Sequence, residues 1–135
     1  MRIIVDTNRI IAALLKAGTT RDLLFNDFFT FLTPDYTLFE IEKHRAVIQQ
    51  KARLAKDDLD VLLALVFERI TVLPASSYAK YIPECRAAVE DADDAPYLAA
   101  CLSSKALGVW SHDPHILKQK KAPVFTNIGL LNLSR

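Results

Sequence analysis

Short, continuous apolar runs alternate along the chain with longer segments of helical periodicity. The run 3–5 is wholly apolar and ends at Asp6, and the run 107–110 leads through two polar residues to Asp113. Continuous apolar runs of this length are typical of strands buried on both faces of a parallel sheet. Further strands are expected at 28–32, 71–73 and 124–126.

Apolar positions three or four residues apart predict helices between these strands. Gly18 is interpreted as the C-cap of the first helix, and Thr33-Pro34-Asp35 is expected to break the second strand. The sequence Thr37-Leu38-Phe39-Glu40 has the form of a capping box that opens a helix. Helices are expected at 9–17, 19–26, 37–50, 56–69, 94–106 and 114–118, with one or two short helices in 76–89 and a final turn at 128–132.

The alternation of strands and helices, without internal repeats, predicts an α/β fold: a three-layer sandwich with a mainly parallel central sheet. A length of 135 residues suits a single domain, 1–135, and 51% hydrophobic residues with only three glycines favour a compact core. Two cysteines, Cys85 and Cys101, are too few for a disulfide framework, which favours a reduced, cytoplasmic setting. The helical spacing around Cys101 makes it a core residue.

The charge balance and hydropathy exclude two classes of protein. Seventeen basic residues against sixteen acidic ones exclude a strongly basic protein, although a local basic patch for a phosphate backbone remains compatible. No apolar run approaches the roughly 20 residues of a membrane span, and the N-terminus lacks the pattern of a signal peptide. We therefore expect no membrane partner.

Asp6 holds the most informative position in the sequence. Open α/β sheets place their ligand sites outside the carboxyl ends of the strands, which is where Asp6 would lie. A desolvated carboxylate needs a cation or hydrogen-bond donors nearby. The structural alternative is that Asp6 caps the following helix through backbone N–H groups.

Three further acids occupy comparable positions. Asp113 follows a second strand, and Glu40 and Asp94 stand where helices are expected to begin, so all four carboxylates fall on one edge of a parallel sheet. Four carboxylates packed together repel one another, and the arrangement is favourable when divalent cations bind between them. Mg²⁺ accepts one or two carboxylates directly, and a pair of ions ~4 Å apart can promote phosphodiester hydrolysis.

Each of these acids also has a purely structural interpretation. Glu40 would close its capping box, at least one acid in 91–94 would be an N-cap, and Asp113 before a proline would cap a helical turn. The pair His112-x-x-His115 has a spacing compatible with zinc, but two histidines alone are weak support for such a site.

Taken in order, the motifs resemble those of PIN domains, the nuclease fold of VapC-type toxins and related RNA-processing enzymes. The resemblance extends over nearly the whole chain and departs from the family at His112, where many relatives carry glycine. It implies that the metal-binding acids are Asp6, Glu40, Asp94 and Asp113, with Asn8 and Ser111 as polar helpers and Asp91 and Asp93 as additional acids.

The resemblance further implies an endoribonuclease that uses one or two Mg²⁺ or Mn²⁺ ions. Its implied setting is a type II toxin–antitoxin system, with RNA as substrate, a homodimeric toxin and an antitoxin peptide covering the acidic pocket. Arg9, Lys43, Arg45 and the run 118–121 are candidate RNA-facing residues, or else ordinary solvated surface.

Three other functions remain open at this point. A PIN nuclease of RNA maturation would carry the same motifs, and a non-catalytic RNA-binding module would keep the fold without the turnover. A HAD-type phosphatase also uses an aspartate at the end of its first strand, but it needs a second acid two residues later, where this chain has Asn8.

Overall fold

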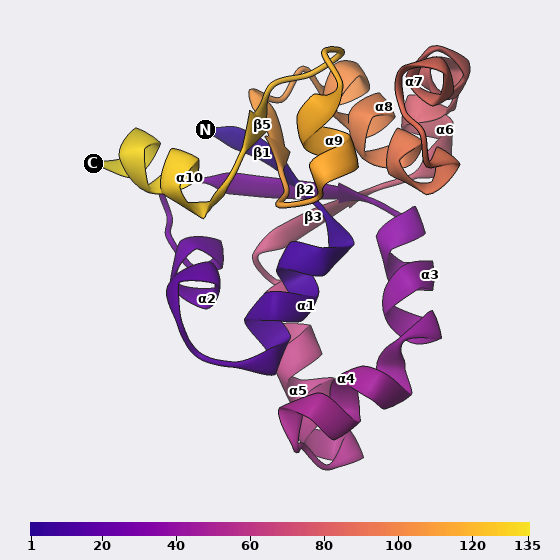
Figure 1. The fold of residues 1–135 in the computed structure, drawn as a ribbon. Coiled ribbons are helices and arrows are strands. Elements are labelled where there is room, and N and C mark those ends of the chain that lie inside the picture. Colours follow the sequence, from indigo (N-terminus) through magenta and orange to yellow (C-terminus); the bar gives the residue numbers. More distant parts are fainter.

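The computed structural model describes residues 1–135 and contains one five-stranded sheet with the strand order β3-β2-β1-β4-β5 (Figure 1). All four neighbouring pairs of strands are parallel. The predicted three-layer α/β fold is confirmed, and the sheet is entirely rather than mainly parallel. The strands are β1 (Arg2–Val5), β2 (Thr30–Pro34), β3 (Ile70–Leu73), β4 (Gly108–Trp110) and β5 (Val124–Phe125).

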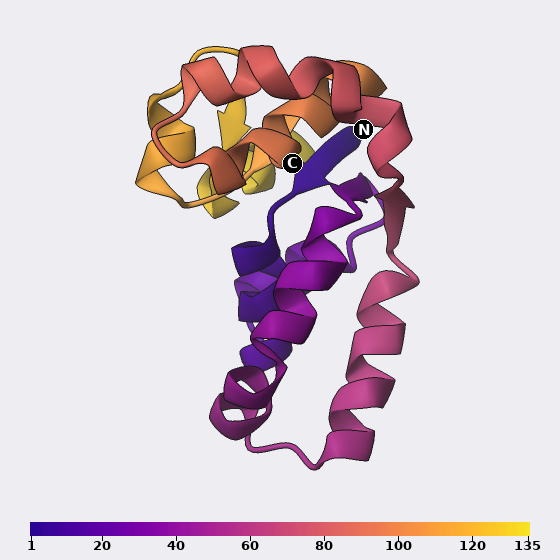
Figure 2. The same cartoon turned by 90° about the vertical axis from the view of Figure 1, so that its right-hand side faces the viewer.

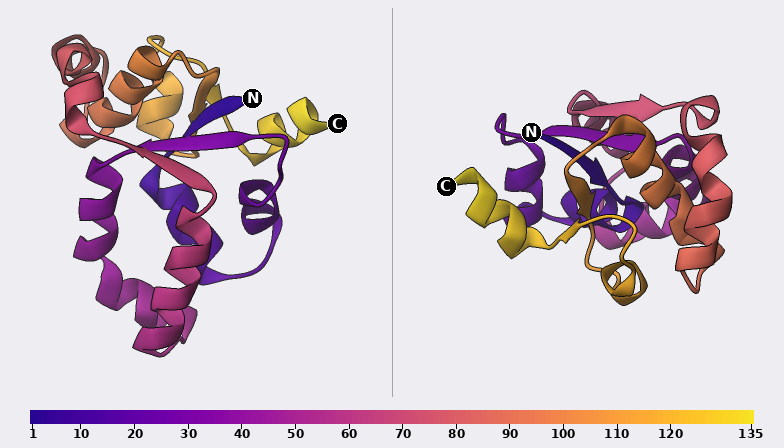
Figure 3. Two further views of the ribbon diagram at one scale, coloured as in Figure 1. Left: turned by 180° about the vertical axis from the view of Figure 1, so that it is seen from behind. Right: turned by 90° about the horizontal axis from the view of Figure 1, so that it is seen from above.

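Helices cover both faces of the sheet. Figure 1 shows α1, α3, α4 and α5 on one side and α6 to α9 on the other, and in Figure 2 the α3–α5 segment extends away from the sheet as an arm. The views in Figure 3 show α10 at the side of the molecule opposite α7. The helices are α1 (Thr7–Leu15), α2 (Thr19–Leu24), α3 (Tyr36–Lys43), α4 (Arg45–Ala52), α5 (Lys56–Phe67), α6 (Ala75–Tyr78), α7 (Ile82–Ala88), α8 (Ala95–Ser104), α9 (Pro114–Lys118) and α10 (Asn127–Ser134), with 3-10 turns η1 (Ala79–Tyr81) and η2 (Ala92–Asp94).

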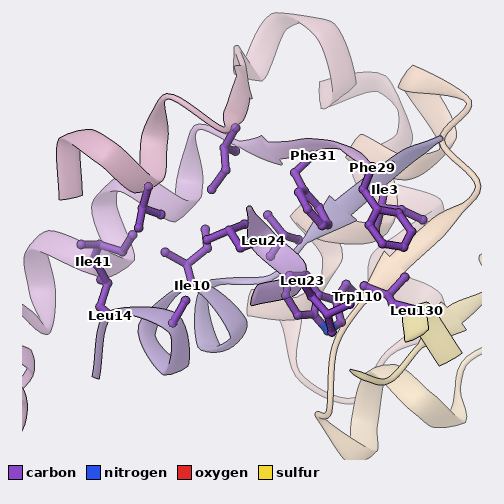
Figure 4. Packing of buried hydrophobic residues seen from close by; sticks show 14 of the residues in the cluster. Ile3, Ile10, Leu14, Leu23, Leu24, Phe29, Phe31, Ile41, Trp110 and Leu130 are labelled. Carbon is purple, nitrogen blue, oxygen red and sulfur yellow. The ribbon is translucent and has the colours of Figure 1, made fainter. Parts of the chain in front are cut away.

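The hydrophobic core lies in two layers because strand side chains alternate between the faces of the sheet. Ile3 and Val5 belong to the layer under α1 and α5, whereas Ile4 belongs to the layer under α8. Figure 4 shows the first layer, in which the rings of Phe31 and Trp110 pack with centroids 5.2 Å apart. Cys101 is buried in the second layer, as its spacing predicted.

The first helix differs from its prediction at both ends. α1 begins at Thr7, directly after β1, and ends at Leu15 with Lys16 in an extended conformation as its C-cap. The interpretation of Gly18 as a C-cap is therefore wrong. Gly18 instead precedes the first residue of α2, where its backbone is extended.

The second strand begins two residues later than predicted and includes Thr33 and Pro34, which were expected to break it. The pairing of β1 with β2 ends at Ile4 and Leu32, so Pro34 lies beyond β1 and pairs only with Leu73 of β3. A proline is tolerated there because Val5 O, the last carbonyl of β1, accepts a hydrogen bond from Thr33 Oγ1 at 2.9 Å and needs no backbone donor from β2.

The predicted capping box is also wrong. α3 begins at Tyr36, so Thr37 lies within its first turn, where it is buried and its hydroxyl contacts that of Thr33 at 2.6 Å. The predicted helix 37–50 is in fact two helices that meet at His44, which ends α3 and precedes α4. The remaining predicted helices agree with the structure to within a few residues. No helix of the structure is both long and apolar enough to span a bilayer.

Candidate active site

The topology of the sheet brings two acid-bearing segments together at its centre. Strand order changes direction at β1, because β2 lies on one side of it and β4 on the other. Val5 pairs with Trp110, and Asp6 N donates a hydrogen bond to Trp110 O at 3.2 Å. The chain therefore leaves β1 and β4 side by side, at the position where open α/β sheets form a ligand crevice.

A cavity of about 210 Å³ lies at this edge of the sheet. Glu40 reaches it from α3, and Asp94 reaches it from η2 at the start of α8. The four acids proposed from the sequence all line this cavity, and only two of its eleven lining residues are hydrophobic. The lining consists of Asp6, Thr7, Asn8, Glu40, His44, Asp91, Asp93, Asp94, Tyr97, Asp113 and Ile116.

Asp6 is both a helix cap and a cavity residue. Its Oδ1 accepts a hydrogen bond from Arg9 N at 2.9 Å, which caps α1, and its side chain is buried. Burial raises the pKa of Asp6 to about 6, although hydrogen bonds from Ser111 and from the Arg9 amide oppose that rise. The predicted capping role of Asp6 is therefore confirmed, and it is compatible with a position at the cavity.

Asp94 provides the strongest indication of a ligand. The residue is 7% exposed, and its Oδ2 is buried without any hydrogen-bond partner. Burial, and then the negative charges of Asp113 and Asp91, raise the pKa of Asp94 to about 7. A buried, unpaired carboxylate oxygen is costly, and a divalent cation in the cavity would satisfy it. The residues present therefore fit a metal ion.

Glu40 does not cap α3 and is free to face the cavity. Its Oε2 lies 3.5 Å from Nε2 of His44, one helical turn further along. His44 lines the same cavity, whereas the sequence placed it only within the candidate RNA-facing segment 43–45, or else on ordinary solvated surface. Its position four residues after Glu40 is the signal that could have placed it, since such pairs share one helix face.

The acids at 91, 93 and 113 differ in their roles. Asp91 and Asp93 are exposed, and Asp91 caps η2 by accepting a hydrogen bond from Asp93 N at 3.0 Å. Asp113 caps α9 by accepting from His115 N at 2.8 Å, while its own N–H donates to Ser111 Oγ at 3.0 Å. Asp91 and Asp113 therefore fulfil the predicted capping roles and still line the cavity.

The two histidines near Asp113 point to different partners. His112 Nε2 accepts a hydrogen bond from Asn127 N at 3.0 Å. His115 instead lies beside Asp94 and Asp113. The two imidazoles therefore do not form the zinc pair that their spacing allowed. His112 stands where many relatives carry glycine, yet Asp113 next to it still lines the cavity.

Two aromatic residues at the site had no role assigned from the sequence. Tyr97 lines the cavity, and its hydroxyl is hydrogen-bonded to the hydroxyl of Thr7. Burial raises the pKa of Tyr97 to about 12, so its hydroxyl stays protonated. Burial and the nearby Glu40 and Asp93 raise the pKa of Tyr36 as well. Tyr97 follows Asp94 by three residues, which places both on one helix face.

The proposed RNA-facing residues lie outside the cavity. Arg9 directs its Nη1 toward Thr20 Oγ1 at 3.5 Å, and Lys43 is exposed on α3. Arg45 forms ion pairs with Glu42 and Asp60. Within the run 118–121, Gln119 is buried and Lys121 pairs with Glu84 at 3.2 Å.

Comparisons with known proteins identify the fold and the family of this chain. No curated protein matches the sequence. The solved structures that share the fold include VapBC2 from Rickettsia felis bound to a DNA fragment from its promoter, with a TM-score of 0.72 and 13% identity over 93% of this chain and 98% of that chain. They also include a toxin–antitoxin complex from Klebsiella pneumoniae, with a TM-score of 0.67 and 13% identity over 93% of this chain and 97% of that chain. The family model described as PIN domain matches residues 4–122. The chain belongs to the PIN domain family.

Proposed function

We propose that this protein is a metal-dependent endoribonuclease that acts as the toxin of a type II toxin–antitoxin system. The observation that carries the proposal is the convergence of Asp6, Glu40, Asp94 and Asp113 on one cavity, with the buried Asp94 Oδ2 lacking any partner. Such a cluster is poorly suited to a neutral ligand and well suited to a divalent cation.

The four acids would hold one or two Mg²⁺ or Mn²⁺ ions. Bound ions of this kind supply a nucleophilic water at neutral pH and stabilise the leaving oxygen of a phosphodiester. Asp6 and Asp94, both buried, would be the principal ligands, and Glu40 and Asp113 would complete the set. No histidine base is required for this chemistry.

Other residues in the cavity and beside it would position the substrate. Asn8 is exposed at the cavity and carries an amide that can donate to a phosphate oxygen. Tyr97, held by Thr7, offers a hydroxyl that stays protonated at neutral pH. Lys43, one turn beyond Glu40 on α3, is the exposed cation nearest in sequence to the acids and would contact the RNA backbone.

The partners are inferred from surface chemistry and from the relatives. An apolar groove of about 270 Å³ between α3 and α5 is lined by Leu38, Ile41, Leu63 and Phe67, among others. We propose that a second copy of the chain covers it, giving a homodimer. The two structures with the same fold are toxin–antitoxin assemblies, and a basic side chain of an antitoxin would complement the acidic cavity.

Cleavage of single-stranded RNA tests the proposal directly. Asp6→Asn and Asp94→Asn should each abolish Mg²⁺- or Mn²⁺-dependent cleavage of a labelled RNA, while circular dichroism shows an unchanged fold. Asp58→Asn, which changes an exposed acid on α5, is the matched control and should retain full activity. Full activity in either cavity variant, or cleavage that persists in excess chelator, would refute the proposal.

A further inference from the structure

A histidine stands beside two of the cavity acids. Asp94, Asp113 and His115 each offer one ligand atom, and these three atoms lie within 4.8 Å of one another. Ligands on opposite sides of a cation are separated by roughly 4 Å, since metal–nitrogen and metal–oxygen bonds are about 2.1 Å long. One ion could therefore contact all three with shifts of less than about 1 Å.

The burial of Asp94 supports this site independently of the clustering. Asp94 is 7% exposed and lines the cavity, and its Oδ2 has no hydrogen-bond partner. Asp113 and His115 belong to one turn, since Asp113 Oδ1 accepts from His115 N at 2.8 Å. That capping bond uses only one of the two oxygens of Asp113 and fixes the turn that carries the imidazole.

The imidazole of His115 is also free to bind. Its Nε2 lies 3.9 Å from Glu90 Oε2, which is longer than a hydrogen bond. Metal-binding histidines commonly give their second ring nitrogen to a carboxylate, and Glu90 is within reach for that role. Of the chain's other two histidines, His112 accepts a hydrogen bond from the Asn127 amide. His44 lines the cavity but lies beside Glu40, outside the group formed by Asp94, Asp113 and His115.

We propose that His115 is a metal ligand together with Asp94 and Asp113, and that this site selects a first-row transition-metal dication over Mg²⁺. The inference rests on the metal centre of the proposed function and specifies its ligand set. Mg²⁺ takes oxygen ligands and retains its waters, whereas the divalent first-row transition metals also accept imidazole nitrogen as a ligand. A mixed nitrogen and oxygen set therefore favours ions such as Mn²⁺, Fe²⁺ or Co²⁺.

Mn²⁺ alone, added to the full chain without RNA, tests the ligand assignment. Pulsed electron paramagnetic resonance should detect nitrogen coupled to the bound Mn²⁺ in the wild type. The coupling should vanish in His115→Gln and persist in His44→Gln and His112→Gln, which together change every histidine in the chain. Calorimetric titration should show that His115→Gln weakens Mn²⁺ binding about tenfold or more while changing Mg²⁺ binding less than twofold.

The outcomes separate this inference from the proposed function. Mn²⁺ that binds without nitrogen coupling, or coupling retained in His115→Gln, overturns the histidine assignment and leaves the nuclease proposal intact. A wild type that binds neither Mn²⁺ nor Mg²⁺ overturns both. If His115→Gln does not fold, ¹⁵N-histidine labelling of the wild type, His44→Gln and His112→Gln still decides, because coupling to labelled nitrogen in all three assigns it to His115.

Discussion

The amide of Asp6 donates a hydrogen bond of 3.2 Å to the carbonyl of Trp110, which joins the ends of the two central strands. This one contact sets the geometry of the site, because Asp6 follows β1 directly and Asp113 follows β4 three residues later. The packing of Trp110 against Phe31 holds the same strand end from within the core. Correct pairing of β1 with β4 is therefore a condition for the acids to meet.

The first prediction concerns β4, the strand that leads to Asp113. A Cβ added at Gly108 would lie 2.6 Å from Pro123 O, a backbone atom of the segment entering β5. Gly108→Ala should therefore lower the free energy of unfolding by about 1–3 kcal/mol, as overpacking commonly does. Gly18→Ala is the matched control, since nothing lies within 4 Å of its added Cβ. Urea unfolding of both variants checks this, and equal stability would contradict it.

The fold could be predicted from the sequence because its main determinants are local. Continuous apolar runs marked the strands, and the spacing of apolar residues marked the helices. The errors arose where tertiary contacts decide a boundary. Thr37 looked like a helix cap, but the structure buries it against Thr33, and Pro34 looked like a strand breaker because its position beyond the end of β1 is invisible in the sequence.

The residues of the site could be predicted from the sequence for a different reason. Parallel topology alone brings the carboxyl ends of strands to one edge, so Asp6 and Asp113 could be placed together from the sequence. The position of His44 at the cavity was not predicted, because it depends on a break between α3 and α4 that the sequence did not reveal. The helix at 114–118 was predicted correctly, but the sequence did not show that His115 would lie beside Asp94. The carboxylate of Asp94 could be predicted, but its unpaired Oδ2 could not.

The second prediction concerns the homodimer. Leu38 is 44% exposed on the apolar groove between α3 and α5. Burying a leucine side chain contributes about 1.5–3 kcal/mol, so Leu38→Lys should raise the dimer dissociation constant by at least about tenfold. Ile128→Lys, on α10 and 70% exposed, should leave it unchanged. Light scattering across a dilution series measures both, and a monomeric wild type would exclude the dimer.

The third prediction concerns pH. Burial raises the pKa of Asp6 to about 6 and that of Asp94 to about 7, against 3.8 for an unperturbed aspartate. Between about pH 4 and pH 7 the folded state therefore binds more protons than the unfolded state, so these two groups lower the stability of the metal-free protein as pH rises. The loss should exceed about 1 kcal/mol, since one pKa unit corresponds to about 1.4 kcal/mol.

A comparison of variants isolates this contribution from other titrating groups. The stability difference between Asp94→Asn and the wild type, measured by urea unfolding in chelator, should widen in favour of the variant from pH 4 to pH 7.5. Saturating Mn²⁺ should reduce the change of this stability difference with pH, because the bound ion offsets the negative charge of Asp94. A difference that stays constant with pH would show that Asp94 titrates normally.

The last prediction follows from the repulsion within the cavity at neutral pH. Asp94→Asn removes one negative charge next to Asp113 and Asp91 without removing apolar contacts, and Asp94 makes no side-chain capping bond to α8 that would be lost. The variant should raise the melting temperature of the metal-free protein by an amount equivalent to ~1 kcal/mol, a common gain when a functional site is relieved. It should also reduce the stabilisation that Mn²⁺ provides, because that stabilisation increases with the logarithm of the ion's affinity for the native state. If Asp94 only interacted favourably with the dipole of α8, replacing it would instead destabilise the protein by roughly 0.3–1 kcal/mol and leave the Mn²⁺ response unchanged.

Asp57→Asn is the control within the same chain, because Asp57 is an exposed acid in the first turn of α5 and can act only on the helix dipole. Thermal unfolding of the three proteins in chelator and in Mn²⁺ separates the two roles, and an Asp94 variant that behaves like the Asp57 variant would remove Asp94 from the metal centre.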